Sequence, residues 1–450
     1  MDWDELAEEQ CQRIFRAWLQ SLAQKWPDLL TQIASQCRPD ARVTEVSRFT
    51  TGAYNLCRIV TFDNGERLLV RFPILGRSHF RSEKVEDEIF VMRYLAEHTR
   101  VPVPTVIGKG NWLGCPYMIM SVIEGTLLSK CLGDPTVESP NLSPTVSDSK
   151  LERAYHGMAQ LVLELSKPTF PSIGALGGDS RYKVVKRPLT LNMNDLVHVG
   201  GYPPSEFTNR MFRTASEYFQ ELATQQFLHL KHQRNNAVRD EVDCRKKYIA
   251  RCLFRRIARD IQTEPGPFRL YCDDFRPSNV LVSESDLTVN GVIDWEFTYV
   301  APSEFTYTAP WWLLFESPEA WESDLNKFLD RYRPRLQLFL KVLRACEDQQ
   351  IWTGALLERQ RLSGRMERSM ESGLFWFCLA ARRSFMFDDI YWTFLDKQYF
   401  GTLNSLDDRL PLLTQEERDG LDDFVQMKLQ QAEEKKVPEH LSLDALVDQK

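Results

Sequence analysis

The segment YCDDFRPSNVLV, residues 271–282, places two adjacent acids, a Pro-Ser corner and an asparagine directly before a β-branched apolar run. Asp, Pro, Ser and Asn also build ordinary turns, so a capped surface loop is the plain interpretation. A second segment, GVIDWEF at 291–297, supplies a further acid after another apolar run. Together they predict a strand–loop–strand unit in which Asp274, Asn279 and Asp294 face one cleft. Carboxylate and amide oxygens suit Mg²⁺ beside phosphate groups, and this combination favours that use over a turn.

The composition is that of an ordinary soluble protein. A chain of 450 residues with 43% apolar and 26% charged residues has room for two or three globular units or one two-lobed domain. The net charge of -7 argues against nucleic acid as a partner. No apolar run approaches the roughly 20 residues of a membrane span, and the acidic start MDWDELAEEQ lacks a signal-peptide pattern. Ten scattered cysteines without a C-x-x-C pair predict reduced thiols and a cytoplasmic location.

The first part of the chain has the pattern of a small β-rich unit preceded by a helix. Helix-spaced apolar residues over 4–36 predict one helix that Pro27 ends or restarts. The DNG sequence at 63–65 predicts a hairpin turn, and apolar spacing predicts a helix at about 80–97. β-rich runs predict strands at 43–49, 55–62, 66–72, 101–108 and 115–125.

The rest of the chain is mostly helical. A Pro-, Ser- and Asp-rich loop is expected at 132–149, and a small β island at 268–300. Helices are expected at 150–166, 205–232, 236–262, 318–346 and 368–387. The patterns divide the chain into a helical extension (1–40), a small lobe (41–125), a helical lobe with the two quoted loops (126–430) and a charged tail (431–450). The fold class is therefore α+β and two-lobed, with a small β-rich and a large mostly helical lobe.

The two quoted motifs resemble the aminoglycoside phosphotransferase and choline kinase group of small-molecule kinases, which have a protein-kinase-like fold. Within it, the chain is most similar to the fungal branch labelled "phosphotransferase enzyme family". The resemblance covers roughly residues 42–400, is most specific at CDDFRPSNVLV and GVIDWEF, and is also visible in PWWLLFESPEAW and FDDIYWTFLD. It implies transfer of the γ-phosphoryl group of ATP, with Mg²⁺, to a hydroxyl of a small-molecule acceptor.

The resemblance also assigns roles within the two loops. The family's catalytic loop reads H-x-D-x-x-x-x-N, so Asn279 fixes the register and puts the catalytic acid at Asp274. Asn279 and Asp294 are then the metal ligands, and Asp273 falls at a variable position. Cys272 stands where histidine is usual, and we expect it to brace the loop rather than act as a nucleophile, because no histidine lies near it in sequence. Phosphoryl transfer needs positioning and charge neutralisation more than covalent chemistry, which suits this residue set.

In the small lobe, the resemblance places a phosphate-gripping cation at Arg71, where the family usually has lysine. Arginine stays charged and offers a planar fork of donors, so it can hold phosphate oxygens with a different geometry. Its partner is expected from the following helix, and Glu88 fits the family pattern better than Glu83 or Glu86. A solvated strand-edge arginine is the alternative.

The remaining expected contacts with nucleotide and acceptor rest on weaker patterns. Thr51 and Gly52 occupy the place of the phosphate-covering loop, and Met120 and Val122 are candidates for the adenine wall. An ordinary turn and ordinary core residues are the alternatives. Aromatic residues expected near the acceptor pocket, or else in the core, are Trp311, Trp312, Trp321, Tyr391 and Trp392.

Three rival functions stay open at this point. A catalytically weak or inactive kinase-like protein that binds nucleotide as a regulatory module is favoured by Cys272, Arg71 and the sparse glycine loop. A protein kinase is disfavoured because the chain passes from Asp294 almost directly to APSEF, with no activation segment. A non-enzymatic helical scaffold leaves the three polar side chains of the two loops without a role. The sequence carries no signal for the acceptor's identity, the choice between ATP and GTP, or the oligomeric state.

Overall fold

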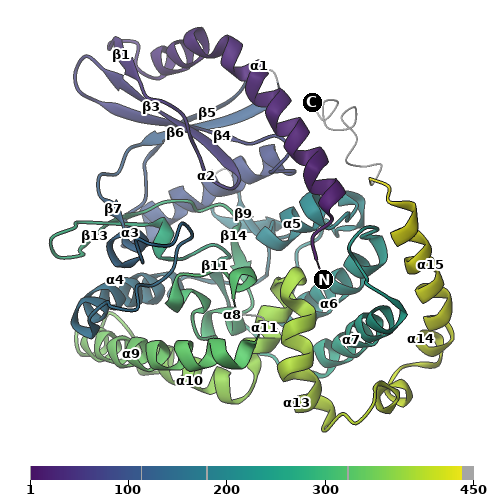
Figure 1. The fold of residues 1–450 in the computed structure, drawn as a ribbon. Coiled ribbons are helices and arrows are strands. Elements are labelled where there is room, and N and C mark those ends of the chain that lie inside the picture. Colours follow the sequence, from purple (N-terminus) through teal and green to yellow (C-terminus); the bar gives the residue numbers. More distant parts are fainter. Residues whose placement is uncertain (1, 113, 179–180, 322–323, 438–450) are drawn as a thin grey trace.

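The computed structural model describes residues 2–112, 114–178, 181–321 and 324–437 and consists of a small β-rich lobe on a larger helical lobe (Figure 1). The small lobe contains an antiparallel sheet with the strand order β1-β3-β4-β6-β5, to which β2 adds a short pairing with β3. Its strands are β1 (Val43–Val46), β2 (Thr50–Thr51), β3 (Asn55–Phe62), β4 (Arg67–Pro73), β5 (Val106–Trp112) and β6 (Cys115–Ser121). The predicted two-lobed α+β class is confirmed.

The hairpin and helix predicted for this lobe are present. β3 and β4 pair in antiparallel register from Asn55 opposite Pro73 to Thr61 opposite Arg67, and Gly65 in the turn has a φ of 83°. That left-handed conformation is the one for which glycine is the favoured residue. Helix α2 (Arg81–His98) follows and packs against β6. Its buried residues include the polar Lys84, Asp87 and Glu88.

Helix α1 (Glu5–Cys37) covers the outer face of this sheet and extends to the helical lobe (Figure 1). Apolar residues at helical spacing form its inner face and join the core of the sheet. This buried cluster includes Trp18, Leu22, Leu30, Ile33, Leu56, Val60, Val70 and Phe72. The helix is continuous through residue 27, so the expectation that Pro27 ends or restarts it is wrong. Packing along the sheet outweighs the local preference of the proline for a helix end.

The beginning of α1 is anchored in the helical lobe. The N-cap Asp4 is fully buried, and its carboxylate accepts from Asn235 Nδ2 at 2.9 and 3.0 Å and from Ala7 N at 3.0 Å. The main-chain N–H of Asp4 donates to Val199 O at 2.8 Å. Because α1 packs on the small-lobe sheet from Trp18 onward, the N-terminal helix is a strap between the two lobes.

Replacing Asp4 with alanine should therefore destabilise the protein more than loss of a helix cap alone. The substitution removes the cap and the carboxylate that accepts from the main-chain N–H and the Nδ2 of buried Asn235, which together should lower the free energy of unfolding by about 2–4 kcal/mol. The matched control is Asp324→Ala, which removes the exposed N-cap of α9 and should cost about 1 kcal/mol. Urea denaturation of both variants measures the difference, and equal losses would contradict the anchoring role.

The helical lobe is built around long helices and two small three-stranded sheets. The main helices are α4 (Asp148–Ser166), α6 (Ala215–His232), α7 (Glu241–Asp260) and α9 (Leu325–Trp352). One sheet has the order β14-β11-β8, with β8 (Thr169–Phe170), β11 (Phe268–Cys272) and β14 (Thr298–Ala301). The other has the order β13-β12-β7, with β7 (Thr126–Leu127), β12 (Val280–Val282) and β13 (Val289–Val292). These sheets carry the two loops quoted above, and the β island predicted at 268–300 is confirmed.

Several helices differ from their predicted bounds. The helix predicted at 205–232 begins at Ala215, and the helix predicted at 318–346 is α9, which begins at Leu325. The single helix predicted at 368–387 is wrong: α10 (Ser363–Glu371) and α11 (Leu374–Arg382) are separated by Gly373, whose φ is 75°. A left-handed glycine ends one helix and starts the next, whereas apolar periodicity continues across it.

The remaining elements are short, with two exceptions. α5 (Leu191–Val199) and α15 (Leu421–Glu434) were not predicted, and the charged tail expected at 431–450 lies mostly outside the described residues. The others are α3 (Leu128–Leu132), β9 (Ala175–Gly177), β10 (Lys183–Lys186), α8 (Ser303–Tyr307), α12 (Phe387–Ile390), α13 (Asp396–Phe400) and α14 (Gln415–Asp419). Within the described ranges, no helix is both long and apolar enough to cross a membrane.

Candidate active site

A cleft of about 860 Å³ lies between the lobes and is lined by residues of both. The sequence indicates nine residues for nucleotide binding, metal binding or catalysis. Eight of them line this cleft: Thr51, Gly52, Arg71, Met120, Val122, Asp274, Asn279 and Asp294. The ninth, Glu88, lies directly behind Arg71 and is buried. Residues that are far apart in the sequence are therefore brought to one cavity.

The loop between β11 and β12 folds back on itself through one asparagine. Asn279 Nδ2 donates to the main-chain oxygen of Asp274 at 2.8 Å and to its carboxylate at 3.1 Å. Arg276 Nε lies 3.0 Å from the other carboxylate oxygen. Burial raises the pKa of Asp274 to about 6, against the opposing effect of Arg276, and nearby Asp294 raises it further. Asp274 is thus a carboxyl group held in place by two partners, with a pKa raised above its ordinary value.

The neighbouring acid, Asp273, points away from the cleft into the helical lobe. Its carboxylate accepts from the main-chain N–H of Leu191 at 3.1 Å and from the Tyr299 hydroxyl at 3.3 Å, and Arg382 Nη1 lies 3.5 Å away. This acid ties the loop to α5 and α11. Asp274 is among the residues that line the cleft, and Asp273 is not.

Cys272 connects the two loops. Its side chain is buried, and its thiol donates a long hydrogen bond to the main-chain oxygen of Glu296 at 3.8 Å. Burial raises the pKa of the Cys272 thiol well above its ordinary value, so the thiol stays protonated at neutral pH. These contacts fit a bracing residue and do not fit a thiolate nucleophile.

Asp294 lies next to Asn279, because the main-chain N–H of Ile293 donates to the main-chain oxygen of Asn279 at 2.9 Å. Asp294 has a left-handed φ of 65°, uncommon for a residue with a side chain, and its carboxylate accepts from Arg71 Nη2 at 2.5 Å. Among the described residues no group of three or more His, Cys, Asp or Glu side chains suits a metal ion alone. The donor set of one carboxylate and one amide oxygen fits Mg²⁺ only if phosphate oxygens complete the coordination.

Arg71 is held by the helix residue that the sequence indicates. Its Nη1 donates to Glu88 Oε1 at 2.7 Å, and the same carboxylate oxygen accepts from the main-chain N–H of Trp295 at 3.1 Å. Glu83 and Glu86 instead pair with other basic side chains. One ion pair therefore joins β4, α2 and the loop that carries Asp294.

Three polar residues at the back of the cleft were not identified from the sequence. Glu296 Oε2 accepts from Arg71 Nη2 at 2.9 Å, from Asn55 Nδ2 at 2.8 Å and from Lys84 Nζ. Lys84 also donates to Asn55 Oδ1 at 2.9 Å. The acid of IDWE is visible in the sequence, but no local pattern shows that its side chain turns toward the small lobe.

The other end of the cleft has aromatic and acidic walls. Of the five aromatic residues expected near an acceptor, Trp311 lines the cleft, whereas Trp312, Trp321, Tyr391 and Trp392 are not among its lining residues. Other lining residues here that the sequence did not indicate are Trp3, Tyr54, Asp195, Glu319, Arg383 and Phe385.

One pair in this part of the cleft has a defined geometry. The Tyr54 hydroxyl donates to Asp195 Oδ1 at 2.7 Å. Burial raises the pKa of Asp195 to about 7, although the Tyr54 hydrogen bond opposes the shift. Tyr54 comes from the small lobe and Asp195 from α5, so this hydrogen bond joins the two lobes at the cleft.

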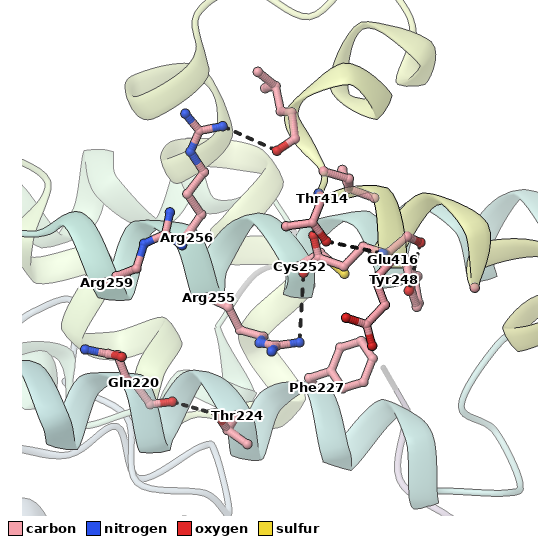
Figure 2. Close-up of a pocket in the computed structure, with 14 residues that line it drawn as sticks. Gln220, Thr224, Phe227, Tyr248, Cys252, Arg255, Arg256, Arg259, Thr414 and Glu416 are labelled. Atoms are coloured by element: carbon pink, nitrogen blue, oxygen red, sulfur yellow. Dashed lines mark hydrogen bonds and ion pairs between the residues drawn. The ribbon is translucent and has the colours of Figure 1, made fainter.

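A second hollow, of about 780 Å³, lies on the helical lobe between α6, α7 and the segment before α15 (Figure 2). Figure 2 shows Arg255, Arg256 and Arg259 extending from one helix, α7, along this hollow. Its acids are Glu416 and Glu417, and its lining residues include no acid held by an asparagine as Asp274 is. The interlobe cleft is therefore the candidate active site.

Comparison with known proteins gives distant similarity. No family model matches the chain. The Clavilactone A biosynthesis cluster protein Y of Ampulloclitocybe clavipes is 26% identical over 278 residues, which is 58% of this chain and 62% of that protein. The mitochondrial protein Altered inheritance of mitochondria protein 9 of Debaryomyces hansenii is 30% identical over 139 residues, 30% of this chain and 21% of that protein. The match thus spans about three fifths of the length of the first curated relative and about one fifth of the length of the second.

Several solved structures that resemble this chain are of small-molecule phosphotransferases. A macrolide 2'-phosphotransferase of Brachybacterium faecium has a TM-score of 0.38 and 13% identity, covering 81% of this chain and 98% of its own. An amicoumacin kinase, solved with AMP-PNP, Ca²⁺ and Ami, has a TM-score of 0.40 and 12% identity, covering 91% and 99%. Aminoglycoside phosphotransferases are also among the similar structures. The aminoglycoside phosphotransferases belong to the group that the two sequence motifs resemble.

Proposed function

We propose that this protein is a phosphotransferase that moves the γ-phosphoryl group of ATP, with Mg²⁺, to a hydroxyl of a small-molecule acceptor. The supporting observation is the convergence of Asp274, Asn279, Asp294 and Arg71 on one interlobe cleft. Phosphoryl transfer requires an acid for the acceptor hydroxyl, oxygen ligands for a divalent cation and a cation for the phosphates. The cleft has all three, and they come from separate elements that fix their positions.

Each residue of this set has a role that follows from its contacts. Asp274, held by Asn279, would orient the acceptor hydroxyl and accept its proton. Asn279 uses its amide nitrogen on Asp274, so its amide oxygen is the atom available to a cation, together with the Asp294 carboxylate. Mg²⁺, when bound with ATP, would neutralise charge on the phosphates. Arg71, braced by Glu88, would hold phosphate oxygens from the small-lobe side.

The nucleotide would lie against the small lobe. Thr51 and Gly52 line the cleft at the β2–β3 turn, where the main-chain N–H of Gly52 donates to Asn55 O at 2.9 Å. Met120 and Val122 line it at the end of β6, where the chain passes between the lobes. We assign the adenine to this apolar wall and the phosphates to the turn and Arg71. The acceptor would enter on the side of Trp311, opposite the nucleotide.

A cytoplasmic location is part of the proposal. All ten cysteines are free thiols. Seven of them are buried: Cys11, Cys115, Cys244, Cys252, Cys272, Cys346 and Cys378. Free thiols in this number suit a reducing compartment such as the cytosol, where ATP and Mg²⁺ are also available.

The pKa of Asp274 predicts how turnover depends on pH. Because the carboxylate must be ionised to accept a proton, the rate should fall as the pH drops through about 6, by about tenfold per unit below it. Arg276 opposes protonation of Asp274, so Arg276→Gln should move the midpoint of this acid limb to higher pH. A profile of the rate against pH for both proteins measures this. A midpoint near 4, unchanged in Arg276→Gln, would contradict Asp274 as the titrating base.

An acceptor screen tests the function itself. Purified protein is incubated with Mg·ATP and a panel of sugars, amino alcohols and other metabolites with free hydroxyl groups, and ATP consumption is recorded. A hit should yield ADP and an acceptor that is heavier by one phosphoryl group. The proposal would be contradicted if ATP consumption were the same with and without each acceptor and the same in native and heat-treated protein.

A second candidate function is nucleotide binding without turnover. Two observations favour it: Cys272 stands where the related kinases usually have histidine, and Arg71 Nη2 is paired with the Asp294 carboxylate. Such a protein would bind Mg·ATP and respond structurally but would not transfer the phosphoryl group. Tight binding of Mg·ATP with no turnover across the acceptor panel would select this function over the first.

A further inference from the structure

The carboxylate of Glu296 is buried at the back of the cleft, where three donors from three elements converge on one of its oxygens. Arg71 comes from β4, Lys84 from α2 and Asn55 from β3. The side chain of Glu296 is only 3% exposed, and that of Lys84 is 2% exposed. A carboxylate that is removed from water in this way is costly unless it is fully paired, and here it is paired twice.

Arg71 divides its two terminal nitrogens between different carboxylates. Nη1 donates to Glu88 at 2.7 Å, whereas Nη2 donates to Asp294 at 2.5 Å and to Glu296 at 2.9 Å. A lysine has a single nitrogen that one carboxylate can hold, whereas Glu88 holds only Nη1 of the Arg71 fork and leaves Nη2 to other partners. Glu296 is positioned to supply a second anchor.

Lys84 forms an ion pair with Glu296 and so balances the charge of this second anchor. Its Nζ contacts Glu296 and also lies 5.6 Å from the centre of the Phe297 ring. Lys84 Nζ and Arg71 Nη2 both donate to Glu296 Oε2, so this buried carboxylate has two cationic partners. Without Lys84, the single charge of Arg71 would face two buried carboxylates, Glu88 and Glu296, before any phosphate reached it.

Resting on the proposed function, we propose that Glu296 and Lys84 are positioning residues that adapt the nucleotide cleft to an arginine at the phosphate-gripping position. Glu296 holds the Nη2 edge of Arg71 at the cleft, and Lys84 neutralises Glu296. If Asp294 held a divalent cation, Arg71 would keep Glu88 and Glu296 as anchors, and the Nη2 hydrogen that it now donates to Asp294 would be available to a phosphate oxygen. Neither residue touches the nucleotide, and both act through Arg71.

Calorimetric titration with Mg·AMP-PNP and with adenosine tests this role. Glu296→Gln and Lys84→Met should each weaken Mg·AMP-PNP binding by roughly tenfold or more, as loss of a supporting partner commonly does. Adenosine binding should stay within about twofold, because adenosine has no phosphates for Arg71 to hold. The matched control is Lys109→Met, since Lys109 is an exposed lysine of the same lobe that pairs with Glu86. An equal loss for both ligands would indicate a general structural defect and overturn the proposal.

A double-mutant cycle between Arg71 and Glu296 separates positioning from packing. In Arg71→Lys, the single nitrogen can be held by Glu88 alone, so adding Glu296→Gln should change Mg·AMP-PNP affinity by less than about twofold. Thermal unfolding shows whether Lys84→Met folds. If it does not, the cycle of Arg71→Lys and Glu296→Gln still tests the positioning role. Effects that simply add would show no coupling and overturn the proposal.

The failure of this inference can be told apart from failure of the proposed function. If native protein binds Mg·AMP-PNP and the Glu296 and Lys84 variants bind it equally well, the positioning role is wrong and the function stands. If native protein binds no Mg·AMP-PNP at all, both are wrong.

Discussion

Replacing Asp274 with alanine should lower the rate of phosphoryl transfer by about 10²- to 10⁴-fold, the usual contribution of a positioned acid or base. Mg·ATP binding should change only a few-fold, because the proposed role of Asp274 concerns the acceptor and its side-chain partners are Asn279 and Arg276 rather than Arg71. Stability should not fall, since the substitution removes a buried carboxyl group whose pKa is raised by burial. Initial rates measure the loss of phosphoryl transfer, and calorimetric titration of the same preparation measures the affinity for Mg·ATP.

The control for this variant is Asp286→Ala, which changes an exposed acid in the β12–β13 turn. It should leave both the rate and the affinity at the native level. If Asp274→Ala keeps more than about a tenth of the native rate, Asp274 does not act as the base, and the loop assignment fails.

Asp294→Asn should have the other large effect, on metal-dependent nucleotide binding. The substitution removes the anionic oxygen available to Mg²⁺, and losing one partner of a buried charge contact costs at least about 2 kcal/mol, or roughly 30-fold in affinity. Arg71 keeps Glu88 and Glu296 as partners, so the small lobe should stay folded. Titration of AMP-PNP at increasing Mg²⁺ concentration measures the loss.

The matched control here is Asp286→Asn, the same chemical change at an exposed position. A native-like dependence of AMP-PNP affinity on Mg²⁺ in Asp294→Asn would show that the metal is held elsewhere. An affinity that falls equally with and without Mg²⁺ would instead assign Asp294 to the arrangement of Arg71 rather than to the metal.

The small lobe could be predicted closely because its signals are local. The hairpin follows from a glycine that the turn requires at Gly65, and α2 follows from apolar spacing within one segment. Predictions failed where packing between distant segments decides the outcome. α1 runs through Pro27 because it lies along a sheet that is formed later in the chain, and Gly373 divides a segment whose apolar pattern is continuous.

The candidate site shows the same division. Asp274, Asn279 and Asp294 lie close in sequence and could be placed from one motif pair, and Arg71 and Glu88 are only 17 residues apart. Glu296 meets Lys84 across 212 residues and Asn55 across 241, and Tyr54 meets Asp195 across 141. No pattern within a strand or helix reports contacts across such distances, so these residues become visible only in the folded chain.

The most direct test of the central claim is ³¹P NMR of native protein with Mg·ATP and the pooled hydroxyl acceptors. The account predicts that the γ-phosphate signal of ATP declines, that ADP appears, and that a phosphomonoester signal grows at the same rate. It also predicts that this conversion needs Mg²⁺ and is absent from a parallel sample of Asp274→Ala. A spectrum in which ATP stays intact in native protein, or declines equally in both samples, would contradict the assignment of the interlobe cleft as a phosphotransferase site.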